Sequence, residues 1–358
     1  MPATTPNLRN STAAIAPRGR HFFFGPGPTN IPDSVLAALH HTTMDFNSPE
    51  FVDIQSGVHT GIMKMLKTKQ HMLMYSANGH GAWEAALVNC FSPGETVLIL
   101  DSGHFASNWA DMAVDLGLNV ERLKADWRTG VPVAAVAARL QADTKGEIKG
   151  LLVVHNETAT GVVHPIAEMR RALDAAGHKA LLLVDAISSF GSIDLPMDAL
   201  GIDVVVAGSQ KGLMMVTGMS LTGISEKAVL RSKSVKTARG YWNWQPMMGA
   251  KPQRFPGTAP VHLFLGLDAS LRLIEAEGFD AVLARHRRLG QAARAAVTAW
   301  GGGERGTATV SSAGVIGPVA MPEILCTDSA RLSDSVTTIL LPAGHDANAL
   351  RSLAHQRY

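Results

Sequence analysis

Short apolar runs alternate with helical patterns from about residue 70 onward, and this alternation limits the possible folds more than any other feature. Two of the runs, Leu181-Leu182-Leu183-Val184 and Val204-Val205-Val206, are apolar at every position, as in strands buried on both faces. Strands that alternate with helices predict a mostly parallel sheet covered by helices on both sides, the α/β class. The expected strands are residues 72–75, 97–100, 120–123, 151–154, 181–184, 204–207 and 219–224.

Helical patterns lie between most of these strands, and the texture of the sequence changes after residue 239. Residues 240–260 are rich in Trp, Met, Pro and Gly and fit no period, so we expect a surface or interface loop. A long helical pattern over 261–300 is broken near Gly278. A smaller domain then follows, with a strand at 335–341 and a helix at 348–356. The earlier expected helices are residues 82–90, 107–116, 133–140 and 166–176.

These patterns predict three regions. Residues 1–20 contain three arginines and no acid, and we expect a flexible lead-in there, with a transit peptide as the alternative. Residues 21–260 form an N-terminal arm and a large domain, and residues 261–358 form an interdomain helix and a small domain.

The composition argues against several classes of partner. The chain has 32 basic and 30 acidic residues and no basic block interleaved with aromatics, so no nucleic-acid partner is expected. No apolar stretch reaches about 18 residues, so no membrane span is expected. Only Cys90 and Cys326 are present, which favours a reducing compartment, and we expect a cytoplasmic protein. The 14 histidines show no spacing typical of a metal site, and His80 and His155 are expected to be core or supporting residues.

Polar groups follow several of the expected strands at the edge where ligands bind in such sheets. The turn Asn78-Gly79-His80-Gly81 opens a helix and offers free N–H groups to a phosphate. A dinucleotide site would need a third glycine where Glu84 stands, although Asp101 is suitably placed. Asp185 directly follows one buried strand and Lys211 follows the next by a short turn.

An amine and an acid at neighbouring strand ends suit pyridoxal 5'-phosphate (PLP). PLP needs an amine to hold it as a Schiff base and an acid to keep its pyridine nitrogen protonated. Lys211 and Asp185 supply these groups, and Phe105 follows another strand and can stack on the ring.

Five motifs occur in an order that resembles the class V PLP-dependent aminotransferases, specifically the serine–glyoxylate and alanine–glyoxylate group. The resemblance covers the chain from about residue 20 to its end and implies PLP-dependent transferase fold type I, with a smaller α+β C-terminal domain. The motifs are Gly25-Pro26-Gly27-Pro28-Thr29, Asn78-Gly79-His80, His155-Asn156-Glu157-Thr158-Ala159-Thr160-Gly161, Val184-Asp185 and Gly208-Ser209-Gln210-Lys211-Gly212.

The resemblance also implies a role for each site residue. Lys211 would carry the cofactor and shuttle a proton, and Asp185 would pair with the pyridinium nitrogen. Thr258 would reach the phosphate from a neighbouring subunit, which implies a homodimer with shared active sites. The remaining implied contacts are Asn78, Gly79, His80 and Gln210 with the phosphate, Phe105 with the ring, Thr158 near the ring hydroxyl and Gly27 in the substrate pocket.

The implied reaction moves the amino group of a small amino acid to glyoxylate, a 2-oxo acid. Serine is the first choice of donor, giving hydroxypyruvate and glycine, and alanine or another small amino acid is the second. Members usually carry a tyrosine near Phe255-Pro256-Gly257, and they continue past the last helix to an arginine that binds the substrate carboxylate. That arginine cannot be carried over to Arg351 or Arg357, so the C-terminal domain is expected to be truncated.

Two other functions follow from the same residues. The first alternative is a PLP-binding homologue with little turnover. The second is a PLP lyase or desulfurase, which would need a mobile nucleophilic cysteine at Cys90 or Cys326.

Overall fold

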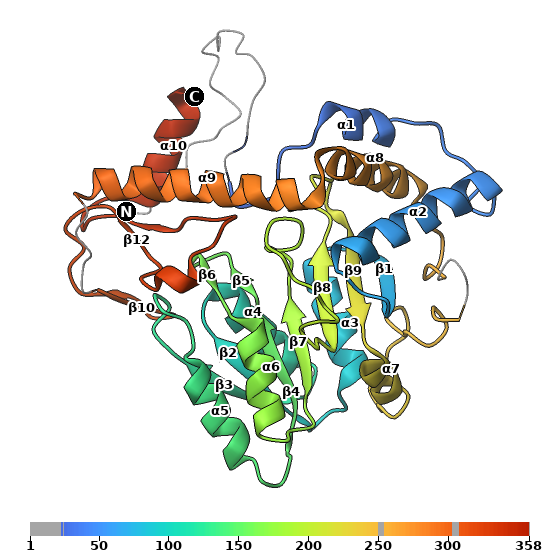
Figure 1. Ribbon diagram of the computed structural model, residues 1–358, viewed down its shortest axis with the longest axis horizontal. Coiled ribbons are helices and arrows are strands. Elements are labelled where there is room, and N and C mark those ends of the chain that lie inside the picture. Colours follow the sequence, from blue (N-terminus) through green and yellow to red (C-terminus); the bar gives the residue numbers. More distant parts are fainter. Residues whose placement is uncertain (1–22, 24, 250–253, 303–307, 358) are drawn as a thin grey trace, which may run out of the picture.

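The structure, a computed structural model, describes residues 23, 25–249, 254–302 and 308–357; the expected lead-in 1–20 lies outside this part of the chain. Its main element is a seven-stranded sheet in the order β1-β9-β8-β7-β4-β2-β3 (Figure 1). Six of the seven strands run in the same direction and β9 alone runs in the opposite one, so the expected mostly parallel α/β sheet is confirmed. The strands are β1 (His71–Ala77), β2 (Thr96–Asp101), β3 (Asn119–Lys124), β4 (Ile148–Val154), β7 (Leu181–Asp185), β8 (Val204–Gly208) and β9 (Gly218–Ile224).

Alternate residues of each strand enter two separate hydrophobic cores, one on each face of the sheet. On β7, for example, Leu182 and Val184 belong to one core, while Leu181 and Leu183 belong to the other. Helices α1 (Asp33–Leu39), α2 (Pro49–Met65), α5 (Val133–Ala142), α6 (Ile166–Ala175) and α8 (Val261–Glu277) cover the first face. Helices α3 (Gly79–Cys90), α4 (His104–Asp115) and α7 (Glu226–Ser232) cover the second.

Two helices begin earlier than the apolar pattern predicts. The expected starts at residues 82 and 107 are in fact Gly79 and His104. The Asn78 side chain caps the first turn of α3, whereas in α4 the amides of Phe105 and Ala106 donate to the distant Glu157. Helices α1, α2 and α7 were not expected. Helix α2 does carry a sequence signal, since Ser48 accepts a hydrogen bond from the Phe51 amide and Pro49 stands at the first helical position.

The break near Gly278 is confirmed. Helix α8 ends at Glu277, Gly278 has a φ of 87°, and α9 (Phe279–Trp300) begins directly after it. Figure 1 shows α9 running from α8 toward β12 and α10. Beyond α9 the C-terminal region is built from short elements: β10 (Thr309–Ser311), β11 (Gly314–Ile316), β12 (Glu323–Ile324), β13 (Ile339–Leu340), α10 (Ala347–Arg357) and the 3-10 turn Ser329–Arg331.

One expectation about irregular regions was wrong, and another was incomplete. The strand expected at 335–341 is limited to Ile339–Leu340, because Ser335 and Val336 instead form a turn bonded to the Ser333 hydroxyl. The segment 240–260 is not only a surface loop, since Trp244 is fully buried in the core under α3 and Met247 packs with it.

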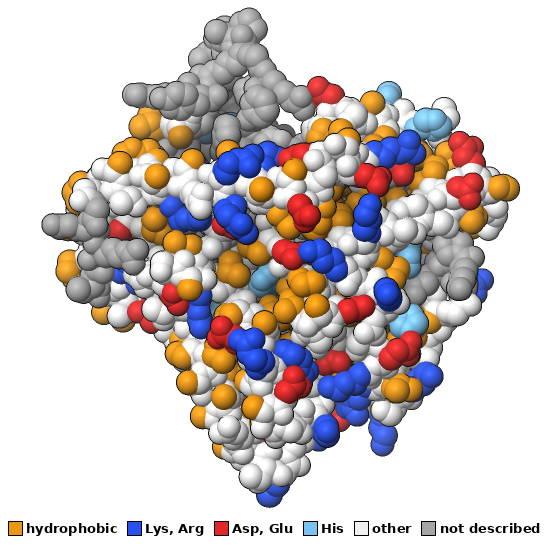
Figure 2. All heavy atoms as spheres, in the orientation of Figure 1, with side chains coloured by type: hydrophobic (Ala, Val, Ile, Leu, Met, Phe, Trp, Pro, Cys, Tyr) orange, Lys and Arg blue, Asp and Glu red, His pale blue; other side chains and the backbone are white. Residues whose placement is uncertain are grey.

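The outer surface carries charges of both signs. Figure 2 shows basic and acidic side chains interspersed over the part of this face formed by α5, α6 and α7. No helix among the described residues is long and apolar enough to cross a membrane.

Candidate active site

A cavity of about 280 Å³ lies at the carboxyl ends of β1, β4, β7 and β8. Nine of the ten site residues expected from the sequence line it, although they come from six separate segments of the chain. These nine residues are Gly27, Asn78, Gly79, His80, Phe105, Thr158, Asp185, Gln210 and Lys211, and the remaining lining residues are Pro28, Trp83, Val154, Asn156, Ile187, Ser188 and Thr217.

Asp185 is the last residue of β7 and is almost completely buried. One carboxylate oxygen accepts a hydrogen bond of 3.1 Å from the Trp83 indole, and the other accepts one of 2.7 Å from the Ile187 amide. Burial raises the pKa of Asp185 to about 7, and the nearby Glu157 carboxylate adds to this rise. The site thus holds a carboxylate that would be stabilised by a cation placed in the cavity.

Lys211 lies in the turn between β8 and β9 and points toward the N-terminal arm. Its Nζ donates a hydrogen bond of 2.5 Å to the carbonyl oxygen of Pro26. Burial lowers the pKa of Lys211, while Asp185 opposes that change. A larger neutral fraction follows, and the neutral amine is the form that attacks a carbonyl group.

Gly27 makes the close approach of the arm to Lys211 possible. A Cβ at this position would lie 2.6 Å from the Lys211 Nζ, and the φ of Gly27 is +138°, which disfavours other residues. Thr29 fixes the arm further along, because its amide and hydroxyl both donate to the Gln210 carbonyl oxygen and the hydroxyl also donates to that of Lys211. Thr29 belongs to the first of the five motifs, but the sequence alone predicts no role for it in the site.

The N-terminus of α3 faces the cavity. The Asn78 side chain accepts hydrogen bonds from the amides of His80 (3.1 Å) and Gly81 (3.3 Å), which caps the helix and fixes its first turn. The positive end of the helix dipole therefore points at this edge of the sheet. Gln210 borders the same cavity, and its buried side-chain oxygen has no hydrogen-bond partner. The backbone N–H groups at the start of α3 fit a site that takes up a phosphate, because they can donate to its oxygens. The Gln210 side-chain oxygen is an acceptor, so this side chain would bind a phosphate only through its Nε2.

Glu157 supports Phe105 from outside the cavity. It is fully buried and accepts hydrogen bonds from the amides of Phe105 (3.1 Å) and Ala106 (3.0 Å) at the start of α4. Phe105 lies edge-on to Trp83, with ring centroids 6.4 Å apart. Neither Glu157 nor Trp83 was assigned a role from the sequence, because only the fold reveals their contacts with Phe105 and Asp185.

Another part of the cavity wall is polar and contacts the C-terminal region. The hydroxyls of Thr158 and Ser188 form a short hydrogen bond with one another. Asn156 donates to the Ser188 carbonyl oxygen (3.0 Å) and to the Ser335 hydroxyl (2.7 Å). The small C-terminal region therefore contacts the cavity wall through Ser335.

His155, His80 and Thr258 lie in three different environments. His155 is buried and bonded to Ser189, as expected for a core residue, whereas His80 is exposed and lines the cavity, so a core role for it was wrong. Thr258 is exposed and does not line the cavity of its own chain. Phe255 packs edge-on against Phe264 in the core, at a centroid distance of 5.8 Å.

The structure also bears on a metal site and on the desulfurase alternative. Among the described residues there is no group of three or more His, Cys, Asp or Glu side chains that could hold a metal ion. Cys90 is fully buried in α3, where burial raises the pKa of its thiol, and Cys326 is buried as well. A desulfurase nucleophile would instead be accessible and have a lowered pKa.

The sequence profile of the family "Aminotransferase class-V" matches residues 21–356. The serine–glyoxylate aminotransferase of Hyphomicrobium methylovorum is 40% identical to the chain over 342 residues, which cover 94% of this chain and 79% of the relative. The L-aspartate–glyoxylate aminotransferase of Paracoccus denitrificans is 41% identical over 337 residues, 94% of this chain and 80% of the relative.

Solved structures agree with these relatives. The alanine–glyoxylate aminotransferase of Nostoc sp. superimposes with a TM-score of 0.82 at 25% identity, covering 97% of this chain and 88% of that one. The pyridoxamine–pyruvate aminotransferase of Mesorhizobium loti gives a TM-score of 0.82 at 26% identity, covering 94% and 81%.

Proposed function

The chain belongs to the aminotransferase class-V family, and we propose that it transfers the amino group of a small amino acid to glyoxylate with PLP as its cofactor. The observation that carries this proposal is the single cavity in which Asp185, Lys211 and the N-terminus of α3 meet. An acid, an amine and a phosphate site are the three groups that PLP needs from a protein.

The cavity residues fit the parts of PLP one by one. Asn78, Gly79, His80 and Gln210 would hold the phosphate at the start of α3, and Phe105 would cover the ring. Asp185 would pair with the pyridinium nitrogen, and Thr158 would bond near the ring hydroxyl. When bound, PLP supplies an electron sink for the negative charge that develops on the substrate Cα.

Lys211 is the proposed base and acid of the reaction. Burial lowers the pKa of its Nζ, which favours the exchange of a proton with the substrate. The Pro26 carbonyl oxygen orients the Nζ, and Gly27 leaves the space in which it moves. Asp185 is itself oriented by Trp83 and Ile187, which keeps its charge at one place while the proton is transferred.

We propose serine as the preferred donor, with hydroxypyruvate and glycine as products. Relatives named for serine and for L-aspartate have nearly the same identity to this chain, 40% and 41%, so aspartate joins alanine as a second candidate. Similar donors differ by only about 1–3 kcal/mol per small group in a pocket. A direct comparison of donors is therefore required.

We also propose that the active protein is a homodimer in the cytoplasm. The exposed Thr258, away from the cavity of its own chain, is available to a second copy. The chain contains only two cysteines, Cys90 and Cys326, which is compatible with a reducing compartment. Size-exclusion chromatography with light scattering tests the dimer, and a monomer that retains full activity contradicts it.

The activity test mixes the purified protein, PLP and glyoxylate with serine, alanine or aspartate in turn and measures glycine and the keto-acid product. Serine is expected to give the highest kcat/KM. If only aspartate or only alanine gives product, that amino acid, and not serine, is the donor. Tight PLP binding without product from any donor would support the alternative of a PLP-binding homologue with little turnover.

Attachment of PLP to Lys211 is tested separately. Borohydride treatment followed by peptide mass spectrometry should find the cofactor's mass on the peptide that contains Lys211. The variant Lys211→Ala should lose this label and fall by at least about 10³-fold in kcat, since it lacks the nucleophile and the proton carrier. A label on another lysine would contradict the assignment.

A further inference from the structure

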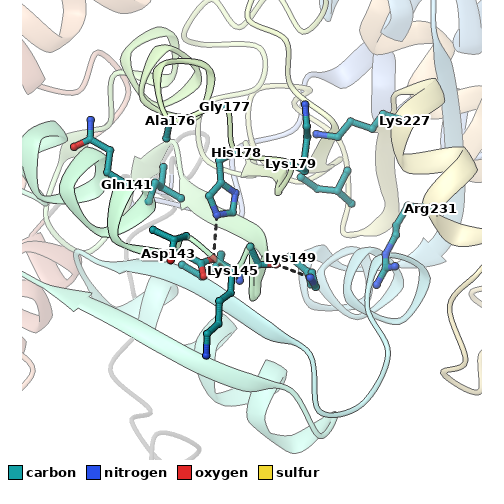
Figure 3. A pocket seen from close by; sticks show the side chains of 15 residues that line it. Gln141, Asp143, Lys145, Lys149, Ala176, Gly177, His178, Lys179, Lys227 and Arg231 are labelled. Carbon is teal, nitrogen blue, oxygen red and sulfur yellow. Dashed lines mark hydrogen bonds and ion pairs between the residues drawn. The ribbon is translucent and has the colours of Figure 1, made fainter.

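A second and larger cavity of about 850 Å³ opens on the side of the sheet away from the active site. It is a groove formed by the α5–β4 loop, the α6–β7 loop and helix α7 (Figure 3). Its lining residues are Leu140, Gln141, Asp143, Thr144, Lys145, Gly146, Ile148, Lys149, Ala176, Gly177, His178, Lys179, Leu181, Lys227 and Arg231.

The groove and the active site lie at opposite ends of the same two strands. Ile148 and Leu181, the first residues of β4 and β7, line the groove, and Val154 and Asp185, the last residues of these strands, line the active site. A seven-residue strand is about 20 Å long. The groove is therefore too distant to be part of the PLP site.

The groove is strongly basic. Five cationic side chains line it against the single carboxylate of Asp143, whereas the net charge of the whole chain is only +2. This concentration of charge creates a local positive potential that attracts anions. The cationic residues are Lys145, Lys149, Lys179, Lys227 and Arg231.

The single carboxylate does not neutralise these cations. Asp143 is buried and accepts hydrogen bonds from the amides of Glu147 (2.9 Å) and Ile148 (2.7 Å) and from His178 Nε2 (3.0 Å). Burial alone would raise the pKa of Asp143, but these three donors lower it to about 2. Asp143 and His178 thus join the two loops that form the groove, and Asp143 forms no ion pair with the lysines that line it.

The lysines differ in how far their charge is already paired. Lys227 lies 3.3 Å from Asp203, and Arg231 forms an ion pair with Glu95. Lys145 and Lys179, in contrast, have neither a hydrogen bond nor an ion pair within the described part of the chain, and both are exposed. In Figure 3 they extend from opposite sides of the His178–Asp143 hydrogen bond.

We propose that this groove binds a small molecule that carries two or more phosphate groups. Lysine ammonium groups bind phosphate as point charges, and two unpaired lysines beside two partly paired cations suit several charged groups on one ligand. The volume lies within the range of about 300–1,000 Å³ typical of small-molecule sites.

The test uses the enzyme with PLP bound, so that the active-site phosphate position is occupied. Isothermal titration calorimetry measures binding of inorganic tripolyphosphate, of ATP and of citrate at low and at physiological salt. Tripolyphosphate and ATP are expected to bind one per chain, more weakly as salt rises, and citrate at least tenfold more weakly. Citrate that binds as tightly as tripolyphosphate overturns the assignment to phosphate.

The double variant Lys145→Glu/Lys179→Glu is expected to bind tripolyphosphate at least tenfold more weakly. The matched control is Lys69→Glu/Lys124→Glu, two exposed lysines outside the groove with the same change in charge, for which the affinity should stay within about twofold. Both variants should keep the aminotransferase rate of the parent, which shows that they fold. Equal losses in both variants, or no saturable binding at millimolar tripolyphosphate, overturn the proposal.

Discussion

The carboxyl group of Asp185 lies in an environment that disfavours its ionised form. It is buried, its two hydrogen-bond donors are uncharged, and its pKa rises to about 7. A group whose pKa is raised by folding stabilises the protein below its unfolded value near 4, and this contribution is lost as the pH rises through the folded value near 7. The ionised form required by the cofactor therefore costs stability in the empty site.

We predict that Asp185→Asn makes the protein without cofactor more stable at pH 8, by up to about 4 kcal/mol, and changes it little at pH 4. The same variant should bind PLP at least tenfold more weakly, because the pyridinium loses its anionic partner. Urea unfolding at the two pH values and a PLP titration measure the two effects. If the variant and the parent differ in stability by the same amount at pH 4 and at pH 8, the pKa of Asp185 is not raised by folding.

Gly27 is predicted to be irreplaceable for a steric reason. In Gly27→Ala the new methyl group would lie 2.6 Å from the Lys211 Nζ, and the alanine backbone would have to adopt a φ of +138°. Either the arm or the lysine must move, so kcat should fall by about 10²-fold or more, as expected for a displacement near 1 Å. Gly57→Ala in α2 is the control, because a methyl group added there would meet no atom within 4 Å and the activity should be unchanged.

At the scale of elements, a small hairpin links the sheet to the active-site wall. It consists of β5 (Asn156–Glu157) and β6 (Val162–Val163) and lies between His155 and His164. The His164 amide donates a hydrogen bond to the His155 carbonyl oxygen. Burial lowers the pKa of His155 to about 4 and that of His164 to about 3. Both rings must therefore stay neutral in the folded protein, and their contribution to stability is lost as the pH falls below about 6.5.

We predict that His164→Gln weakens the acid sensitivity of the fold. Between pH 6 and pH 4 the slope of unfolding free energy against pH should decrease by about 1.4 kcal/mol per pH unit, the value for one proton. The glutamine amide can still donate to the Val154 carbonyl oxygen, which His164 Nδ1 approaches at 3.0 Å. Chemical denaturation across this pH range gives the slope, and identical slopes for both proteins contradict the prediction.

The elements that the sequence predicts well are those whose burial leaves a simple pattern. The strands β7 and β8 are apolar on both faces, and the α8–α9 break has a glycine at a positive φ, so both were found. Short strands such as β12 and β13 depend on each other for pairing and carry no pattern of their own, which explains the error at 335–341. Trp244 looked like a loop residue because its burial depends on α3, which is distant in the sequence.

The candidate site divides in a similar way. Residues that line the cavity, such as Lys211 and Asp185, stand at strand ends and can be predicted from chemistry and order. Residues that act through another side chain, such as Trp83 on Asp185 and Glu157 on Phe105, depend on contacts between distant segments. Only the folded structure identifies them.

At the scale of the whole molecule, one buried ion pair connects the sheet to the C-terminal region. Arg128, in the β3–α5 loop, contacts Glu323 of β12 at 3.3 Å and donates to the carbonyl oxygens of Leu325 (3.0 Å) and Ala308 (2.7 Å). Both charged side chains are at most 5% exposed. Loss of one partner would leave a buried charge without compensation.

Arg128→Met is therefore predicted to cost about 3–5 kcal/mol of stability, measured by urea or thermal unfolding. The double variant Arg128→Met/Glu323→Leu should lose less, because it removes both charges. The control Arg272→Ala removes an exposed ion pair within α8 and should cost less than about 1 kcal/mol. A loss as small as that of the control contradicts a connecting role for Arg128.

The position of β9 between β8 and β1 has a consequence for synthesis on the ribosome. Strand β1 pairs only with β9 in the sheet, and their paired residues are about 140–150 positions apart in the chain. At about 5–20 residues per second, β1 emerges roughly 7–30 s before its partner exists. During this interval the strand and the α3 turn that follows it have no sheet edge to join. The sheet edge next to the start of α3 is thus completed late in translation, and until then the unpaired apolar strand β1 is a target for a chaperone.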